Sequence, residues 1–404
     1  MKYQCKTIEE EADKIDGRSY VGLSKEKESY RITTPHGFEL PEIIENLNRN
    51  DKILIKKYIR CIYKALNTGN KKKKTLTAEG DNLYDPLSAL YLTVDYIQNG
   101  IYKEIETHDT TDTNGRINFS KTIKRKIPLC VNDEAYYTNF NITKKKVNSE
   151  KLLSLAQGNV INHFMQHGGE LIFGNLVYVN VQNIDLDKSL ITKLYKEKQT
   201  SFNTRKKQII QWIIDYINGT ILNEAKKNWD FSIVASSLWE EMIDSCYSNQ
   251  KYRDKTQYGL KYRLNLKTGN KCDSTSSEHD SIYETENEII IIDAKMYRKA
   301  TNLNSSEVLD KQFGYYSSAK NKCPNKHIYN VLIKPYVEAE IDENIGVIGT
   351  IPNPLRSVIP ELKDDFIIIY SVRFEEILDA YYYNKKIGYN LLNEIRDVTP
   401  ESFA

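Results

Sequence analysis

The sequence predicts an α/β (α+β) protein in which a mixed central sheet, flanked by helices, lies in the second half of the chain. Four consecutive isoleucines between Glu288 and Met296 are too apolar on both faces for a surface strand and suit the middle of a buried sheet. Around them the periodicity gives the order helix, two strands, helix, strand. A chain of 404 residues can build more than one core. We therefore expect an N-terminal mixed domain over residues 1–150 and a second domain over residues 151–404.

The composition excludes several classes of function. A net charge of +2 argues against a general nucleic-acid coat, so any basic surface must be local. The six cysteines are scattered without a CxxC pair, which predicts reduced thiols instead of a disulfide frame or a zinc site. No apolar run approaches the length of a membrane span, and no Walker-A sequence occurs. We expect a cytoplasmic protein without a P-loop of its own.

The N-terminal half combines a weak strand with well-marked helices. We expect the strand at 19–23 and helical structure over 43–63. A further helix is predicted from Asp85, a suitable N-cap, to Gly100, a suitable C-terminal stop.

A basic stretch follows, in which a turn leads into a short strand and a helix start over residues 114–125. Its cationic residues, with those shortly after it, are Arg116, Lys121, Lys124, Arg125, Lys126 and Lys144–Lys146. Two interpretations stay open: a solvated face, or a surface that meets DNA phosphates or an acidic partner protein.

The helix expected over residues 150–167 carries two histidines. His163 and His167 stand four residues apart on one face, which is the spacing of a helical zinc pair. Because only Glu170 lies nearby, packing or surface histidines are the favoured interpretation. The elements expected next are a strand at 171–181 and helices at 186–200, 209–222 and 231–247.

Residues 251–272 are basic and aromatic. The cations that we select as candidate DNA contacts are Lys251, Arg253, Lys261 and Arg263. Such a segment is suited to guiding a DNA backbone, and a solvated basic loop is the alternative.

The isoleucine strand forms a predicted hairpin with the run that begins at Asp280. Side chains alternate along a strand, so Asp293 and Lys295 share one face, and Asp280 can sit beside Asp293. Two carboxylates and a lysine at the end of an apolar strand are costly unless the charges are used. A bound divalent metal would use them, whereas the alternative is a strand end with solvated charges.

After the hairpin we expect a helix from Ser305 or Ser306 to about Lys320, on which Gln312 and Tyr316 face the same way. Strands at 327–333 and 366–372, separated by a long loop, and a helix at 375–386 complete the expected elements.

Asp280 and Asp293-Ala-Lys295 resemble the PD-(D/E)xK nuclease motif, with His279 in the place of its proline. The helix ending DYIQNG, followed by GRINFSKTIKR, resembles the LlaJI family of restriction endonucleases, which are relatives of the McrC subunit of the McrBC system. The resemblance extends, with gaps, from about Tyr84 to Tyr382.

This resemblance implies Mg²⁺-dependent cleavage of double-stranded DNA by a restriction-endonuclease-like core. Asp280 and Asp293 would bind the metal, Glu240 of the pair Trp239-Glu240 would complete the acidic shell, and Lys295 would stabilise charge. Glu241 is the less favoured acidic residue, and Gln312 and Tyr316 would be accessory residues.

It also implies partners: an McrB-like AAA+ GTPase contacted by the N-terminal half, and a cognate DNA methyltransferase in the same system. The alternatives are a stand-alone nuclease of repair or recombination, and a non-cleaving activator of the GTPase.

Overall fold

The computed structural model describes residues 2–7, 14–15, 18–26, 29–38, 40, 49–68, 83–84, 87–110, 116–132, 134–148, 151–174, 177–221, 228–249, 257–260, 263–265, 271–273, 278–303, 305–338 and 344–403. It has two compact units, Met1–Leu83 with Lys227–Ala404 (unit 1) and Tyr84–Lys226 (unit 2). The division expected after residue 150 does not coincide with this one, since the chain leaves unit 1 near Leu83 and returns to it near Lys227. The α/β class is confirmed.

The first sheet of unit 1 joins the N-terminal strands to a strand that lies some two hundred residues later in the chain. Its order is β1-β4-β3-β11-β5, with β2 paired to β3. The bounds are Lys2–Thr7 for β1, Lys14–Ile15 for β2, Arg18–Glu26 for β3, Ser29–Thr34 for β4, Leu83–Tyr84 for β5 and Asn228–Val234 for β11. The expected strand at 19–23 is confirmed within β3. The helix start expected at residue 231 is wrong, because Phe231 and its β-branched neighbours pair antiparallel with Leu23 and its neighbours in β3.

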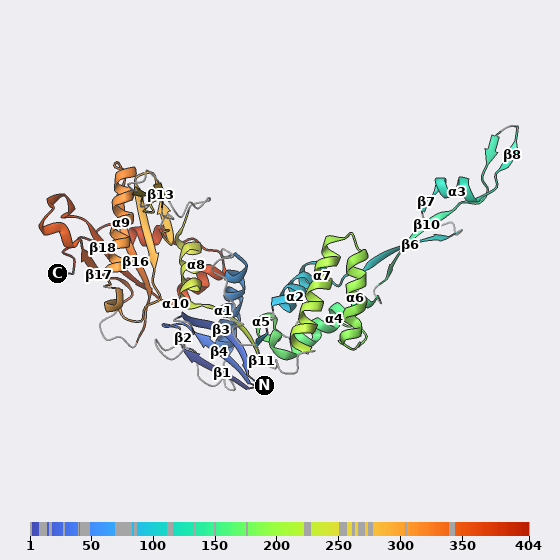
Figure 1. Cartoon of the computed structure of the whole chain (residues 1–404), viewed down its shortest axis with the longest axis horizontal. Coiled ribbons are helices and arrows are strands. Elements are labelled where there is room, and N and C mark those ends of the chain that lie inside the picture. Colours follow the sequence, from blue (N-terminus) through green and yellow to red (C-terminus); the bar gives the residue numbers. More distant parts are fainter. Residues whose placement is uncertain are drawn as a thin grey trace. The chain divides into compact units, whose positions relative to one another are not determined.

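The second sheet of unit 1 contains the isoleucine strand and has the order β14-β15-β16-β18-β17; Figure 1 labels β16, β17 and β18. The bounds are Ser281–Glu284 for β14, Glu288–Ala294 for β15, His327–Pro335 for β16, Gly346–Pro352 for β17 and Phe366–Val372 for β18. The expected hairpin is confirmed, since β14 and β15 are antiparallel. β15, β16 and β18 run parallel. β17 was missed, because it lies in the segment expected to be a loop.

Helices cover both faces of this sheet, so Ile289 to Ile292 are all 0% exposed. The helix α9 (Ser306–Lys322) packs on the face of Ile289 and Ile291, where its Tyr315 and Ala319 join their cluster.

The opposite face carries Tyr283, which lies beside Tyr247 of α8 (Ala235–Tyr247) and Gly388 of α11 (Gly388–Ile395). Unit 1 also contains the helices α1 (Arg49–Thr68) and α10 (Phe374–Tyr382) and a short hairpin that pairs β12 (Arg263–Asn265) with β13 (Lys271–Asp273).

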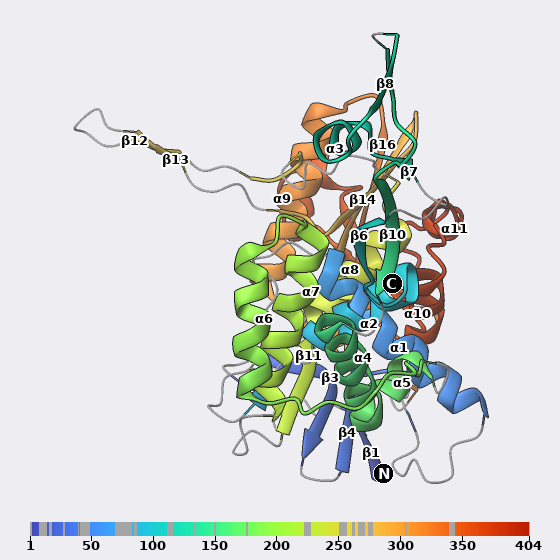
Figure 2. The same cartoon turned by 90° about the vertical axis from the view of Figure 1, so that its right-hand side faces the viewer.

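Unit 2 is built on a group of helices, in which α6 and α7 lie side by side (Figures 1 and 2). The bounds are Leu87–Asn99 for α2, Leu152–Phe164 for α4, Glu170–Phe173 for α5, Lys188–Thr200 for α6 and Thr204–Tyr216 for α7. Single π-helical segments, Met165–Gly169 and Ile217–Ile221, continue α4 and α7.

The strand expected at 171–181 is wrong. α5 ends at Phe173 and is followed by Gly174, which has a φ of 77°, and residues 177–181 form no strand. Side chains of α4 hold this segment instead: Asn162 exchanges two hydrogen bonds with the backbone of Val179, of 2.8 and 2.9 Å. Amide side chains thus take the place of a strand partner.

An arm, Glu104–Asn148, extends from the helices of unit 2 (Figure 1). Its stem pairs β6 (Glu104–Thr110) antiparallel with β10 (Ile142–Asn148). Its outer part contains β7 (Arg116–Ile117), α3 (Phe119–Arg125), β8 (Leu129–Val131) and β9 (Glu134–Tyr136). The short strand and helix start expected here are confirmed.

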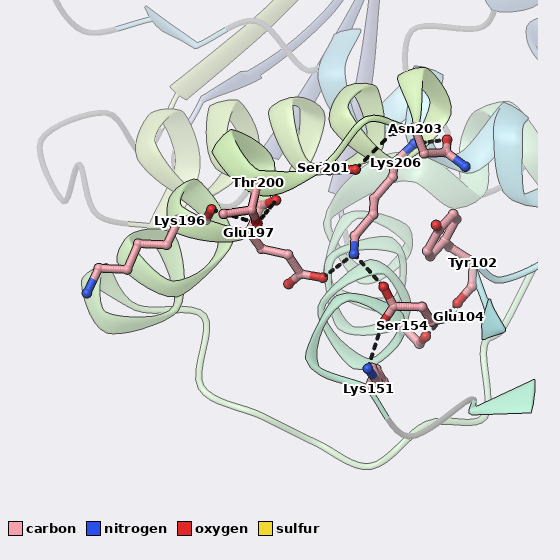
Figure 3. A network of polar contacts seen from close by, with 10 residues as sticks. All are labelled: Tyr102, Glu104, Lys151, Ser154, Lys196, Glu197, Thr200, Ser201, Asn203 and Lys206. Carbon is pink, nitrogen blue, oxygen red and sulfur yellow. Dashed lines mark hydrogen bonds and ion pairs between the residues drawn. The ribbon is translucent and has the colours of Figure 1, made fainter. Parts of the chain in front are cut away.

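Ion pairs anchor the base of the arm (Figure 3). Glu104 bonds Lys151 at 2.7 Å and Lys206 at 2.6 Å, and Lys206 also bonds Glu197 of α6 at 2.7 Å. Nearby, the backbone N–H of Tyr102 donates to the side chain of Gln157 at 2.7 Å. Opposite charges thus alternate around a lysine that is only 8% exposed.

Candidate active site

Asp280 and Asp293 lie opposite each other at the end of the β14–β15 hairpin. Ser281 pairs with Ile292, so the next pair along the antiparallel ladder is Asp280 and Asp293. Oδ2 of Asp280 accepts a hydrogen bond of 2.8 Å from the backbone N–H of Ala294. The two carboxylates therefore project from neighbouring strands on one face of the sheet.

Lys295 lies on the same face, two residues beyond Asp293. Its ammonium forms an ion pair with Oδ2 of Asp293. Its backbone N–H donates to the carbonyl of Ile333 in β16 at 2.8 Å, which extends the parallel ladder past the last residue of β15. The Lys295 side chain is 22% exposed, so its ammonium combines burial with some access to solvent.

Burial sets the electrostatics of this group. Asp293 is 8% exposed, and burial, followed by the negative charge of Asp280, raises its pKa to about 7, although Lys295 opposes the shift. Burial by itself lowers the pKa of Lys295, but its attraction to Asp293 and Asp280 outweighs burial and raises it. The site therefore holds a carboxyl whose pKa lies close to neutral pH, a shift of the kind found at functional sites.

The charge of Glu240, a residue of α8, also acts on this group. Glu240 is partly buried, and its negative charge acts to raise the pKa of Lys295. The charge of the next residue, Glu241, instead acts on Lys64 of α1. Successive helical residues point about 100° apart, which is consistent with the two glutamates acting on different lysines.

The residues that precede β14, Glu278 and His279, contact α9. His279 is 4% exposed, and its ring lies edge-on to Tyr315 with centroids 6.2 Å apart. The hydroxyl of Tyr315 donates to the carbonyl of Glu278 at 2.7 Å. A packed histidine thus occupies the position where the nuclease motif has proline.

Gln312 and Tyr316 of α9 point into the fold. Gln312 is fully buried, and its Nε2 donates to the carbonyl of Val331 at 3.3 Å. Burial, with a smaller contribution from Asp365, raises the pKa of Tyr316. These contacts tie both side chains to the neighbouring strand and loop, and an accessory role in the chemistry stays a prediction.

The candidate DNA contacts fall mostly outside the described residues. Lys251, Arg253 and Lys261 lie outside them, and Arg263 is described only as a backbone position in β12. Their role stays a prediction.

The two histidines of α4 are engaged with protein groups. Nδ1 of His163 lies 2.8 Å from the hydroxyl of Tyr216, and Nδ1 of His167 lies 2.6 Å from the carbonyl of His163. Their rings stack with centroids 4.0 Å apart. This arrangement agrees with the packing interpretation.

In the part of the chain that the structure describes, no three or more His, Cys, Asp or Glu side chains form a group able to hold a metal. Glu240 is therefore not assembled with the two aspartates into one ligand set. A pair of carboxylates still fits Mg²⁺, which keeps several waters and is commonly held by one or two carboxylates plus phosphate oxygens.

One contact near the site was not expected from the sequence. The indole Nε1 of Trp239 donates to the carbonyl of Ile333, the same oxygen that accepts from Lys295. A tryptophan on the apolar stripe of α8 signals packing, and its hydrogen-bond partner cannot be read from the sequence.

A mixed sheet whose strand ends bring two aspartates and a lysine together has the geometry of a candidate metal-dependent nuclease core. The model of the LlaJI restriction endonuclease family matches residues 20–353, and the chain belongs to this family. The comparison with curated proteins gives no match.

Among solved structures, the chain is similar to one in the refined half-complex from a tetradecameric assembly of Thermococcus gammatolerans McrB AAA+ hexamers with bound McrC. The identity is 14%, the TM-score is 0.41, and the match covers 93% of this chain and 82% of that one. None of the described helices is long and apolar enough to cross a membrane.

Proposed function

We propose that this protein is the nuclease subunit of a restriction system and hydrolyses phosphodiester bonds of double-stranded foreign DNA with Mg²⁺. The observation that carries the proposal is the pairing of the partly buried Asp280 with the buried Asp293 beside Lys295. Membership of the LlaJI restriction endonuclease family supports the reaction class. We expect the reaction to take place in the cytoplasm.

Each residue of the site has a role in this mechanism. Asp280 and Asp293 would hold Mg²⁺ through carboxylate oxygens and leave positions for water and a phosphate oxygen. The bound ion would polarise the phosphate and lower the pKa of an attacking water. The ammonium of Lys295 would stabilise charge that develops on the phosphate, and Glu240 would keep that ammonium charged and oriented.

The experiment is DNA cleavage by the purified protein with its partner and Mg²⁺. Asp293→Ala should lower cleavage by at least about a hundredfold, because the carboxylate serves the metal and not the packing. Asp310→Ala, an exposed aspartate of α9, is the matched control and should cleave normally. Cleavage by Asp293→Ala at the wild-type rate would contradict the proposal. If the wild type stimulates the GTPase but never cleaves, a non-cleaving activator is the better account, and cleavage without any partner favours a stand-alone nuclease.

We also propose that the partner is an McrB-like AAA+ GTPase, and that a cognate methyltransferase protects the host DNA. The outer part of the arm supports a docking role. Several of its apolar side chains are more than half exposed: Phe119, Ile123, Ile127, Leu129 and Val131. The basic residues Arg116, Lys124 and Arg125 are exposed beside them. An exposed apolar patch rimmed by cations is typical of a surface that meets another protein.

Charge reversal on the arm tests the docking proposal in the full-length chain. Lys124→Glu with Arg125→Glu should reduce the stimulation of GTP turnover by about tenfold or more and make the complex weaker at every salt concentration. The control reverses two exposed lysines of α6, Lys193 and Lys196, and should leave stimulation unchanged. Equal stimulation by both variants would rule out the arm as the docking element.

A further inference from the structure

A groove of about 980 Å³ lies in unit 2, between α2, α4 and the segment 177–184 that follows α5. Its apolar lining includes Ile97 of α2, which is 54% exposed, together with Leu155 of α4 and Val181 of the segment. Polar side chains, among them Asn180, complete the lining. A groove of this volume that combines apolar with polar side chains is typical of a binding site.

The segment 177–184 has the burial pattern of a strand. Val179 is 4% exposed and Val181 is half-buried, whereas the side chains between and beside them are exposed. Both valines pack on Gly158 of α4, where a Cβ would lie 2.6 Å from Val181 and 3.1 Å from Val179. The glycine therefore lets the segment lie directly on the helix.

One edge of this segment is bonded to α4, since the side chain of Asn162 takes both the N–H and the C=O of Val179. In an extended chain neighbouring residues direct these groups to opposite edges, so those of Tyr178 and Asn180 lie at the other edge. Among the described residues, neither of these two makes a backbone hydrogen bond with the protein. Because Asn180 lines the groove, an open strand edge borders it.

The charge of the groove indicates which kind of segment it would accept. Lys103 and Arg205 line it, and none of the described Asp or Glu residues does. Arg205 donates two hydrogen bonds to Asp95, of 3.0 and 2.8 Å, so its charge is balanced within the fold. Lys103 is exposed, and no ion pair joins it to another described residue. An uncompensated ammonium favours a ligand that carries a carboxylate.

We propose that this groove binds an extended acidic segment of a partner protein. The segment would pair through its main chain with the open edge at Tyr178 and Asn180, and would place a carboxylate at Lys103. The proposal does not depend on the nuclease activity, because every residue that carries it belongs to unit 2.

Selection of random seven-residue peptides on the full-length protein tests the charge preference. The selected peptides should contain more Asp and Glu than the unselected library. A selected peptide, resynthesised with a fluorescent label, should bind Lys103→Glu about tenfold more weakly than the wild type. Lys188→Glu is the matched control, an exposed lysine of unit 2 that does not line the groove, and should bind the peptide normally. A selected set without acidic enrichment would overturn the proposal.

A pair of tryptophan substitutions tests the location. Asn180→Trp fills the groove, whereas Asn183→Trp changes an exposed asparagine of the same segment outside it. Both positions are exposed, so neither change should affect folding. Peptide binding should weaken at least about tenfold in Asn180→Trp and stay within about twofold in Asn183→Trp. Equal binding by the two variants would mean that the peptide binds elsewhere, which contradicts the proposal.

Methylation of backbone nitrogens in the selected peptide separates strand pairing from charge attraction. Only alternate residues of a strand bond one neighbour, so methyl groups on one alternate set should weaken binding at least about tenfold. Methylation of the other set should change it by less than about twofold. The same result for both sets would overturn main-chain pairing at this edge.

Discussion

Two carboxylates of this protein have opposite surroundings and opposite pKa shifts. Asp293 of unit 1 is buried beside Asp280, and its pKa is raised to about 7. Glu104 of unit 2 receives hydrogen bonds from Lys151 and Lys206, which lower its pKa. At Glu104 the charges are balanced within the fold, which is typical of a structural network. At Asp293 two aspartates lie beside one lysine, and such an excess of negative charge with a shifted pKa is typical of functional sites.

The largest change in the free energy of unfolding is expected at the base of the arm. Lys206→Met would leave Glu104 and Glu197 close together without the cation between them. We expect a loss of about 2 kcal/mol, below the range for a fully buried pair because both carboxylates are partly exposed. Chemical denaturation followed by a probe in unit 2 measures it. Lys151→Met is the control and should cost less than about 1 kcal/mol, because its side chain is 35% exposed. Equal small losses for both would show that the network does not anchor the arm.

The pKa of Asp293 is raised, whereas that of Glu104 is lowered, so ionisation of Asp293 should destabilise the fold as the pH rises. The pKa of this carboxyl is 3.8 as its ordinary value and about 7 in the fold, so the folded state binds the proton more tightly. Its contribution to stability is therefore complete below about pH 4 and is lost as the pH rises through about 7. Asparagine does not ionise, so the stability of Asp293→Asn should not fall with this titration. In metal-free buffer the variant should gain on the wild type between pH 5 and pH 8, by at most about 1.4 kcal/mol per pH unit.

Denaturant unfolding of both proteins at several pH values gives this difference. A constant difference across that range would mean that Asp293 titrates normally, and the contrast with Glu104 would disappear.

The sequence allowed the hairpin of the candidate site to be predicted because its determinants are local. Four isoleucines specify a buried strand, alternation puts Asp293 and Lys295 on one face, and a short turn brings Asp280 opposite. Each of these relations spans fewer than twenty residues, so the printed sequence contains all of it.

The division into units could not be predicted, because it depends on pairing between distant strands. No sequence feature near Phe231 indicates that it pairs with Leu23, because the whole of unit 2 lies between the two residues in the chain. The strand expected at 171–181 failed for a related reason. The apolar pattern there was real, but Asn162 of α4 satisfies the backbone that a strand partner would have satisfied.

The supporting contacts of the site were also beyond sequence analysis. The bond from Trp239 to Ile333 joins residues 94 positions apart. The choice between Glu240 and Glu241 depends on the rotation of α8, which packing sets. Types of residue can be read from a sequence, whereas the direction in which a helix presents them requires the fold.

The most direct test of the central claim is the position of a bound metal. Crystals soaked in Mn²⁺, which replaces Mg²⁺ and scatters anomalously, should show a peak between the carboxylates of Asp280 and Asp293 and none at Glu104 or Glu197. Asp293→Asn crystals, soaked alike, should lose the peak. A peak at Glu104, or none near Asp293 at saturating Mn²⁺ above pH 7, would contradict the assignment of the hairpin as the metal site.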